Sequence, residues 1–197
     1  MKIIGITGKS GSGKSTLAKE LTEKMQDAMC INVDKIGHKA TSDVEITKKL
    51  CKAFGKQILG KDEKIDRKKL GNIVFSDKEK MDFLTEITWG YMQKILDDII
   101  EEEREKGTKV IILEWALLPI GKYWEMCNTK IYVEANEQLR KNKVIQRDQI
   151  SEEYFLKRDS GGIDYTPYKF DFVFKNDYKM ETIEKFYINI KNMINQI

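Results

Sequence analysis

The chain has 197 residues, of which 41% are hydrophobic and 34% charged, so it can bury a core and is too apolar for a disordered protein. Thirty-five Lys and Arg against 32 Asp and Glu leave a formal net charge of +3, interspersed along the chain, which gives little reason to expect a nucleic-acid partner. No uncharged apolar run is long enough to span a bilayer, so we expect no membrane association.

The cytoplasm is the expected compartment, because the first residues hold too short an apolar stretch for a secretory signal. The cysteines Cys30, Cys51 and Cys127 are odd in number and widely spaced, so they indicate neither a disulfide framework nor a zinc site. We expect a single domain with small insertions, since the length exceeds the usual domain size only slightly.

Strands and helices are predicted to alternate along the chain. Short apolar runs indicate strands at 2–7, 30–33, 109–114, 129–133 and 172–174. Apolar residues at helical spacing indicate helices at 14–21, 43–54 (behind the caps Thr41 and Ser42), 66–75, 76–106 (closed by Gly107), 136–148 and 182–194. This alternation predicts an α/β fold of three layers, α/β/α, with a five-stranded parallel sheet that binds ligands beyond the carboxyl ends of its strands.

The segment after the first strand predicts a phosphate-binding loop. Residues Gly8 to Ser15 read G-K-S-G-S-G-K-S and satisfy the G-x-x-x-x-G-K-[ST] pattern between a predicted strand and a predicted helix. The glycines let backbone N–H groups turn inward around phosphate oxygens, Lys14 reaches the β- and γ-phosphates, and Ser15 ligates Mg²⁺. We expect ATP and Mg²⁺ to bind through the following residues: Gly8, Ser10, Gly11, Ser12, Gly13, Lys14, Ser15 and Thr16.

A phosphate loop alone does not separate kinases, GTPases and ATP-driven machines. The chain has no N-K-x-D segment to read a guanine base, and it is short for a motor ATPase. A small-molecule kinase fits best. A nucleoside monophosphate kinase of the same fold and a non-catalytic ATP-binding switch remain as alternatives.

Two acids follow predicted strands at the edge where the loop lies. Asp34 comes after the second strand, where an acceptor hydroxyl must be held, and is the candidate base. Glu114 ends the buried third strand, a position from which an acid can hold a magnesium-bound water. Lys14 and Asp34 are therefore the expected catalytic residues derived from the pattern itself.

Several segments resemble the dephospho-coenzyme A kinase family. Residues 33–38 (V-D-K-I-G-H) are similar to the family's D-A-D-x-I-[AG]-[RH] segment. Residues 65–77 (I-D-R-K-K-L-G-N-I-V-F-S-D) are similar to its [LI]-D-R-x-x-L-[GA]-x-[IL]-V-F-x-[DN] run, and residues 112–118 to its V-[LV]-D-[IV]-P-L-L strand. The second run is specific to this family and is not shared by P-loop proteins at large. The resemblance implies an adenylate-kinase-like fold and phosphorylation of the ribose 3′-hydroxyl of dephospho-coenzyme A.

The resemblance also implies a domain plan and further site residues. The core would comprise 1–36, 107–147 and 170–197, with a helical acceptor-binding insertion at about 37–106 and a short lid at about 147–162. Arg147 would act as a catalytic lid cation and join Arg158 and Asn176 in contacting the nucleotide, with Lys143 in a family arginine position. Acceptor binding would fall to Asp34, His38, Asp66 and Arg67. The expected partner is a small molecule, and the chain would be a monomer or a small homo-oligomer.

The chain departs from the family pattern at several places. Asn32 and Glu114 each stand where the pattern has Asp, and Trp89-Gly90 replace a His-Pro pair. Ala116 replaces a Pro, and Gly162 and Thr166 replace a Gln and a Lys.

Overall fold

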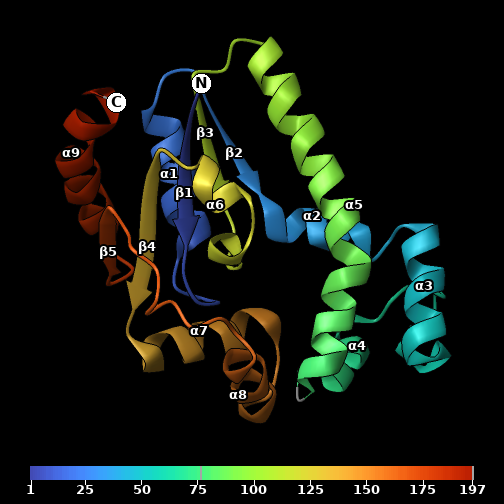
Figure 1. Cartoon of the computed structure of the whole chain (residues 1–197). Helices are drawn as coiled ribbons and strands as arrows, with labels where there is room; N and C mark the ends of the chain where they lie inside the picture. The colour runs from blue at the N-terminus through green and yellow to red at the C-terminus, as the bar shows by residue number, and fades with distance from the viewer. Residues whose placement is uncertain (76, 197) are drawn as a thin grey trace. The chain divides into compact units, whose positions relative to one another are not determined.

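Five strands of the chain form one parallel sheet (Figure 1). The computed structural model describes residues 1–75 and 77–196, and its strands follow the order β2-β3-β1-β4-β5. All pairings are parallel, which confirms the predicted five-stranded sheet. The strands are β1 (Lys2–Thr7), β2 (Ala28–Asn32), β3 (Val110–Glu114), β4 (Thr129–Ala135) and β5 (Phe172–Asn176).

Helices separate the strands along the chain, as parallel connections require. Those in the first half are α1 (Lys14–Lys24), α2 (Val33–Ala40), α3 (Val44–Phe54), α4 (Arg67–Val74) and α5 (Lys78–Glu105). Those in the second half are α6 (Tyr123–Met126), α7 (Glu137–Asp148), α8 (Glu152–Ser160) and α9 (Met180–Gln196). None of the helices in the described part of the chain is long and apolar enough to cross a membrane.

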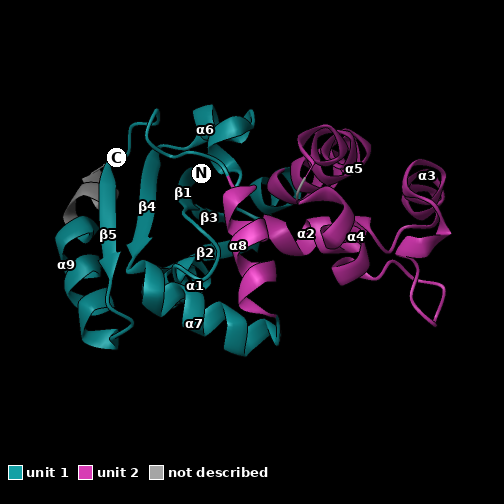
Figure 2. Cartoon of the chain, turned by 90° about the horizontal axis from the view of Figure 1, so that it is seen from below, with its two compact units in different colours: residues 1–32, 101–150, 163–197 teal, residues 33–100, 151–162 magenta. Residues whose placement is uncertain are grey.

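The chain divides into two compact units (Figure 2). The first unit comprises 1–32, 101–150 and 163–197 and contains the whole sheet. The second unit comprises 33–100 and 151–162 and is helical apart from one isolated bridge between Leu59 and Ile65. Each unit has its own cluster of buried apolar side chains.

In the first unit, alternate residues of β1 pack on opposite faces of the sheet. Ile4 and Ile6 are buried on one face, in a cluster with Leu17 of α1 and Ile183 of α9. On the other face, a Cβ at Gly5 would lie 2.7 Å from the Cys127 sulfur, so α6 and the turn after it press directly on the backbone there. Helices therefore cover both faces, with α1 and α6 on opposite sides of the strands (Figure 2). The period of two in the strand produces this division.

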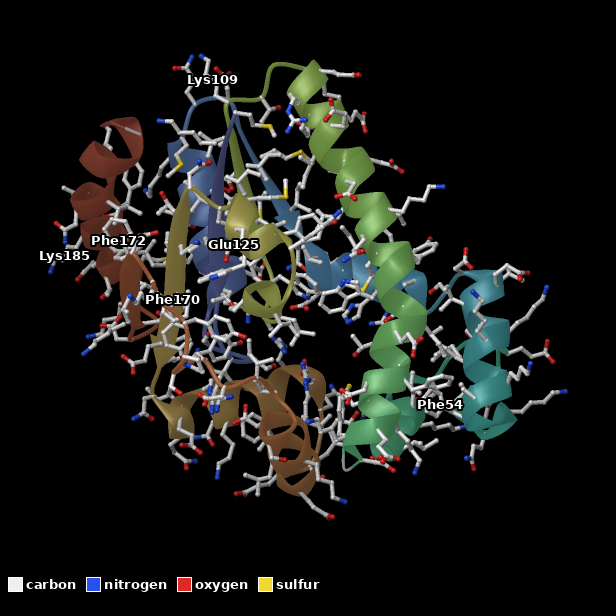
Figure 3. The ribbon with its side chains drawn as sticks, in the orientation of Figure 1. Phe54, Lys109, Glu125, Phe170, Phe172 and Lys185 are labelled. Atoms are coloured by element: carbon white, nitrogen blue, oxygen red, sulfur yellow. The ribbon has the colours of Figure 1, made fainter. Side chains whose placement is uncertain are left out.

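Aromatic rings fill the edges of both faces. Phe170 packs its ring 5.6 Å from that of Trp124 in α6 and 5.0 Å from that of Tyr132 in β4 (Figure 3). Phe172, two residues on, meets the Phe186 ring of α9 edge-on at 6.2 Å. These contacts fix β5 and its flanking segments against the sheet.

In the second unit, α3 and α4 supply most of the buried cluster. Leu50 and Ile58 are fully buried, and the Phe54 ring meets Phe83 of α5 edge-on at 6.2 Å (Figure 3). The spacing of buried residues along α3 matches its helical period, which is why the sequence predicted this helix.

The helices α2, α6 and α8 were not predicted, and three details of the predicted elements were wrong. The second strand runs Ala28–Asn32 and ends before Val33, which already begins α2. The cap of α3 is Asp43, whose carboxylate accepts from the N–H groups of Glu45 and Ile46, and not Thr41 or Ser42. The closing helix begins at Met180, before the predicted Thr182. Ser76, the predicted start of the long helix, lies outside the described residues, and Asp77 accepts a hydrogen bond from the Lys80 N–H there.

Candidate functional site

The loop between β1 and α1 has a backbone that only glycine can form. Gly8, Gly11 and Gly13 have φ of 146°, 79° and 96°. A Cβ at Gly8 would lie 2.5 Å from the Val133 carbonyl oxygen, and one at Gly13 would lie 2.1 Å from Nδ2 of Asn176. Positive φ and these close approaches together exclude a side chain at both positions. The loop is therefore wound tightly between β4 and the end of β5.

Three consecutive carbonyl groups of the loop accept hydrogen bonds from side chains far along the chain. The pairs are Arg140 Nη1 to Ser10 O at 3.0 Å, Tyr178 Oη to Gly11 O at 2.9 Å and Asn176 Nδ2 to Ser12 O at 2.7 Å. In a trans peptide the N–H points away from the preceding carbonyl. Holding the Ser10 and Ser12 carbonyls in this way turns the N–H groups of Gly11 and Gly13 to the opposite side, as an anion-binding loop requires.

Two of these three donors were not predicted. Arg140 in α7 is 2% exposed, and its position three residues before Lys143 and seven before Arg147 would have placed it on the same helix face as these cations. Tyr178 has φ of 64°, and burial raises the pKa of its hydroxyl, which keeps it a donor. Asn176, predicted to contact the nucleotide, holds the loop itself.

The interior of the loop contains a lysine and a buried hydroxyl. Lys14, at the first position of α1, is 6% exposed, and its ammonium group donates to the Lys9 carbonyl at 3.1 Å. The hydroxyl oxygen of Ser12 is buried and has no hydrogen-bond partner among the described residues. Such an oxygen costs roughly 1–3 kcal/mol unless something bonds to it. A phosphate oxygen bound in the loop would supply that bond, so the loop fits the polyphosphate of a nucleotide.

Glu114 connects the start of α1 with the ends of two strands. The residue is 3% exposed, and its carboxyl group accepts from the Ser15 hydroxyl at 2.6 Å and from Nδ2 of Asn32 at 2.5 Å. Hydroxyl and carboxylate oxygens are the ligands that Mg²⁺ prefers, and Mg²⁺ in kinases is usually bound by one or two protein groups together with phosphates. Ser15 and Glu114 therefore fit the predicted magnesium site. Thr16, the next residue of α1, is exposed.

Asp34, the predicted base, belongs to the second unit. It is the second residue of α2 and lies in that helix's first turn, two residues after β2 ends. Asp34 is partly buried and interacts with neighbouring groups. Its role toward the loop stays a prediction, because Asp34 and the loop lie in different units.

The second unit brings several predicted acceptor-binding residues together. The guanidinium group of Arg67 donates to the His38 carbonyl at 3.5 Å. His38 keeps an exposed surface, yet partial burial lowers the pKa of its imidazole, and the positive charges of Arg67 and Arg158 lower it further. Asp66 caps α4 by accepting from the N–H groups of Lys68 and Lys69. Arg67 and Arg158 thus place positive charge around His38 within one unit, and the lowered pKa keeps the imidazole itself mainly neutral near pH 7.

Two predicted cations lie on α7 in the first unit. Arg147 forms two hydrogen bonds with its neighbour Asp148, at 2.7 and 3.0 Å, and these raise the pKa of its guanidinium group. The ammonium group of Lys143 lies 4.5 Å from the centre of the Tyr178 ring. Arg147 is exposed at the end of the helix. Arg140, seven residues earlier on the same helix, is buried and contacts the loop.

Residues 2–178 match the family model described as dephospho-CoA kinase. A dephospho-CoA kinase of Fusobacterium nucleatum is 35% identical over 151 residues, covering 77% of this chain and 76% of its own length. A dephospho-CoA kinase of Aquifex aeolicus is 36% identical over 159 residues, covering 80% of this chain and 79% of its own.

Three solved structures resemble the chain in fold, and one of them is a dephospho-CoA kinase. The dephospho-CoA kinase of Campylobacter jejuni has a TM-score of 0.58 and 28% identity, over 98% of this chain and 97% of its own. A Thermus thermophilus protein has a TM-score of 0.76 and 25% identity, over 100% of this chain and 97% of its own. A shikimate kinase of Bacteroides thetaiotaomicron, 12% identical with a TM-score of 0.51 over 98% of both chains, shares the fold alone.

Proposed function

This chain belongs to the dephospho-coenzyme A kinase family, and we propose that it transfers the γ-phosphoryl group of ATP to the ribose 3′-hydroxyl of dephospho-coenzyme A, giving coenzyme A and ADP. The observation that carries the proposal is the loop in which the Ser10, Gly11 and Ser12 carbonyls all accept hydrogen bonds from side chains distant in the sequence. Such a loop presents N–H groups to a polyphosphate without having to rearrange.

The loop and α1 would hold the nucleotide. The glycine backbone binds phosphate oxygens through its N–H groups, and Lys14 places a positive charge beside the phosphoryl group that moves. Ser15 and Glu114 would hold Mg²⁺. When bound, Mg²⁺ neutralises charge on the phosphates and orients them.

The second unit would supply the acceptor side. We propose that Asp34 accepts the proton of the attacking hydroxyl, and that His38, Asp66 and Arg67 bind dephospho-coenzyme A. The positive charge of Arg67 and Arg158 around His38 supports this role, because the substrate carries a diphosphate. Arg147 and Arg158 would stabilise negative charge in the transition state from a lid at about 147–162, and the helical insertion at about 37–106 would hold the acceptor.

We also propose that the protein works in the cytoplasm, as a monomer or a small homo-oligomer. Cys30, Cys51 and Cys127 are free thiols, which is typical of a reducing compartment. Light scattering on the purified protein measures the oligomeric state.

An acceptor panel tests the reaction. Purified protein with ATP and Mg²⁺ is given dephospho-coenzyme A or each of several nucleoside monophosphates, and ADP release is followed. We expect only dephospho-coenzyme A to stimulate release. Stimulation by a nucleoside monophosphate instead would assign a nucleotide kinase, and ATP binding without stimulated release would assign a non-catalytic switch; either result contradicts the proposal.

A substitution tests the base. Asp34→Asn keeps the shape of the side chain but cannot accept the proton, so kcat should fall by at least ~10²-fold. The matched control is Asp43→Asn in the same unit, because Asn caps a helix about as well as Asp and α3 should be unaffected. A kcat for Asp34→Asn within about 2-fold of that control would remove Asp34 from the mechanism.

A further inference from the structure

Asn32 and Glu114 lie side by side at the carboxyl ends of neighbouring strands. In the parallel register of β2 and β3, Asn32 is directly opposite Glu114. Nδ2 of Asn32 donates to Oε2 of Glu114 at 2.5 Å, and the Ser15 hydroxyl donates to Oε1 at 2.6 Å. The resemblance described above implies Asp at each of these positions, and this chain has Asn and Glu instead. The two departures are therefore in contact with each other.

These two bonds constrain the Glu114 side chain. A glutamate has three side-chain torsions, and its terminal torsion is broad, so burial alone does not fix the plane of the carboxyl group. One donor on each oxygen does fix it, and the amide of Asn32 is the donor that leaves Oε1 directed at Ser15. A buried carboxylate also needs such partners to offset its loss of water.

We propose that Asn32 is a positioning residue for the magnesium site. Its amide holds the longer Glu114 side chain so that one oxygen stays beside the Ser15 hydroxyl, where the metal ion would bind. Asn32 itself touches neither the metal nor the phosphates. The inference rests on the proposed function, since it takes Ser15 and Glu114 as the magnesium ligands.

The readout is the gain in nucleotide affinity that Mg²⁺ gives. A non-hydrolysable ATP analogue is titrated into each variant by calorimetry, once with Mg²⁺ and once with EDTA, and the ratio of the two dissociation constants is compared. No acceptor is present, so failure of the acceptor panel would leave this measurement unaffected. A purely structural role for Asn32 would weaken binding equally in both titrations and leave the ratio unchanged.

The variants remove or keep the donor. Asn32→Ala and the similarly sized Asn32→Leu should lower the Mg²⁺-dependent gain by about 10-fold, the usual effect of removing a group that orients a metal ligand. Asn32→Gln keeps an amide donor and should recover most of the gain, to within about 3-fold of the original chain. The leucine variant carries the test if the alanine variant does not fold.

Two controls separate positioning from stability. The Asn128 side chain accepts a hydrogen bond from the Ile3 N–H at 2.8 Å, away from the loop. Asn128→Ala removes this bond and should leave the Mg²⁺-dependent gain in affinity unchanged. In a Glu114→Gln background, Asn32→Leu should add less than about 2-fold, because residues acting through one group are not additive. The proposal would be overturned if Asn32→Leu kept the full Mg²⁺-dependent gain in affinity of the original chain. It would also be overturned if Asn32→Gln lost as much of that gain as Asn32→Leu.

Discussion

Replacing Gly13 by alanine tests whether the loop is held by the contacts described. Gly13 has φ of 96°, and a Cβ there would lie 2.1 Å from Nδ2 of Asn176. That nitrogen donates to the Ser12 carbonyl at 2.7 Å, so the added methyl group must displace it and break the bond. Gly107 is the matched control, because its φ is 80° and a Cβ there would meet no atom of the described residues within 4 Å.

The expected cost of each change follows from these contacts. A non-glycine residue in a left-handed conformation costs roughly 1–2 kcal/mol, and both variants share this term. Only Gly13→Ala also breaks the bond of a buried asparagine to a loop carbonyl, which costs roughly 1–3 kcal/mol more. We therefore expect the free energy of unfolding to fall by about 2–5 kcal/mol in Gly13→Ala and by about 1–2 kcal/mol in Gly107→Ala.

Urea unfolding of the variants measures these differences. Asn176→Ala should be costly in the original chain and nearly neutral in the Gly13→Ala background, because the bond is already broken there. Affinity for an ATP analogue should fall in Gly13→Ala and stay unchanged in Gly107→Ala. If the two glycine variants lose the same stability to within about 0.5 kcal/mol, the packing of Asn176 against the loop is not as described.

Four further outcomes are expected. Arg140→Met keeps the buried stem but loses the charged donor to a loop carbonyl, so nucleotide affinity measured by calorimetry should weaken by about 10-fold or more, and unchanged affinity would argue against a positioning role. His38 is the only histidine, and burial together with Arg67 and Arg158 lowers its pKa, so its NMR titration midpoint should lie below 6.5 and rise in Arg158→Ala; a midpoint above 6.5 would contradict the described cluster. Because the folded pKa is the lower one, His38 should make stability fall as the pH drops from about 6.5 toward that midpoint, and His38→Asn should lack this component in urea unfolding at pH 5 and 7. Gly90→Ala fills open space on α5 and should raise the free energy of unfolding by about 0.5–1 kcal/mol, whereas a loss would mean that the position is packed.

The sequence by itself determined the elements and the phosphate loop. Apolar runs and helical spacing are local properties, so they predicted the five strands and the helices α1, α3, α4, α5, α7 and α9, but they missed α2, α6 and α8. The glycine pattern before α1 carries its own steric requirement, and φ at Gly11 and Gly13 is positive as the loop requires. Local patterns failed at boundaries, where Asp43 proved the better cap because its carboxylate reaches two backbone N–H groups.

Only the tertiary structure decided which side chains hold the loop and the acid beside it. Arg140 and Tyr178 reach loop carbonyls from 130 and 167 residues away, and Asn32 meets Glu114 across 82 residues. Such contacts depend on the strand order β2-β3-β1-β4-β5, which places strands distant in sequence next to each other. Spacing along the chain does not contain that order, because it is set by how the apolar faces of strands and helices pack together.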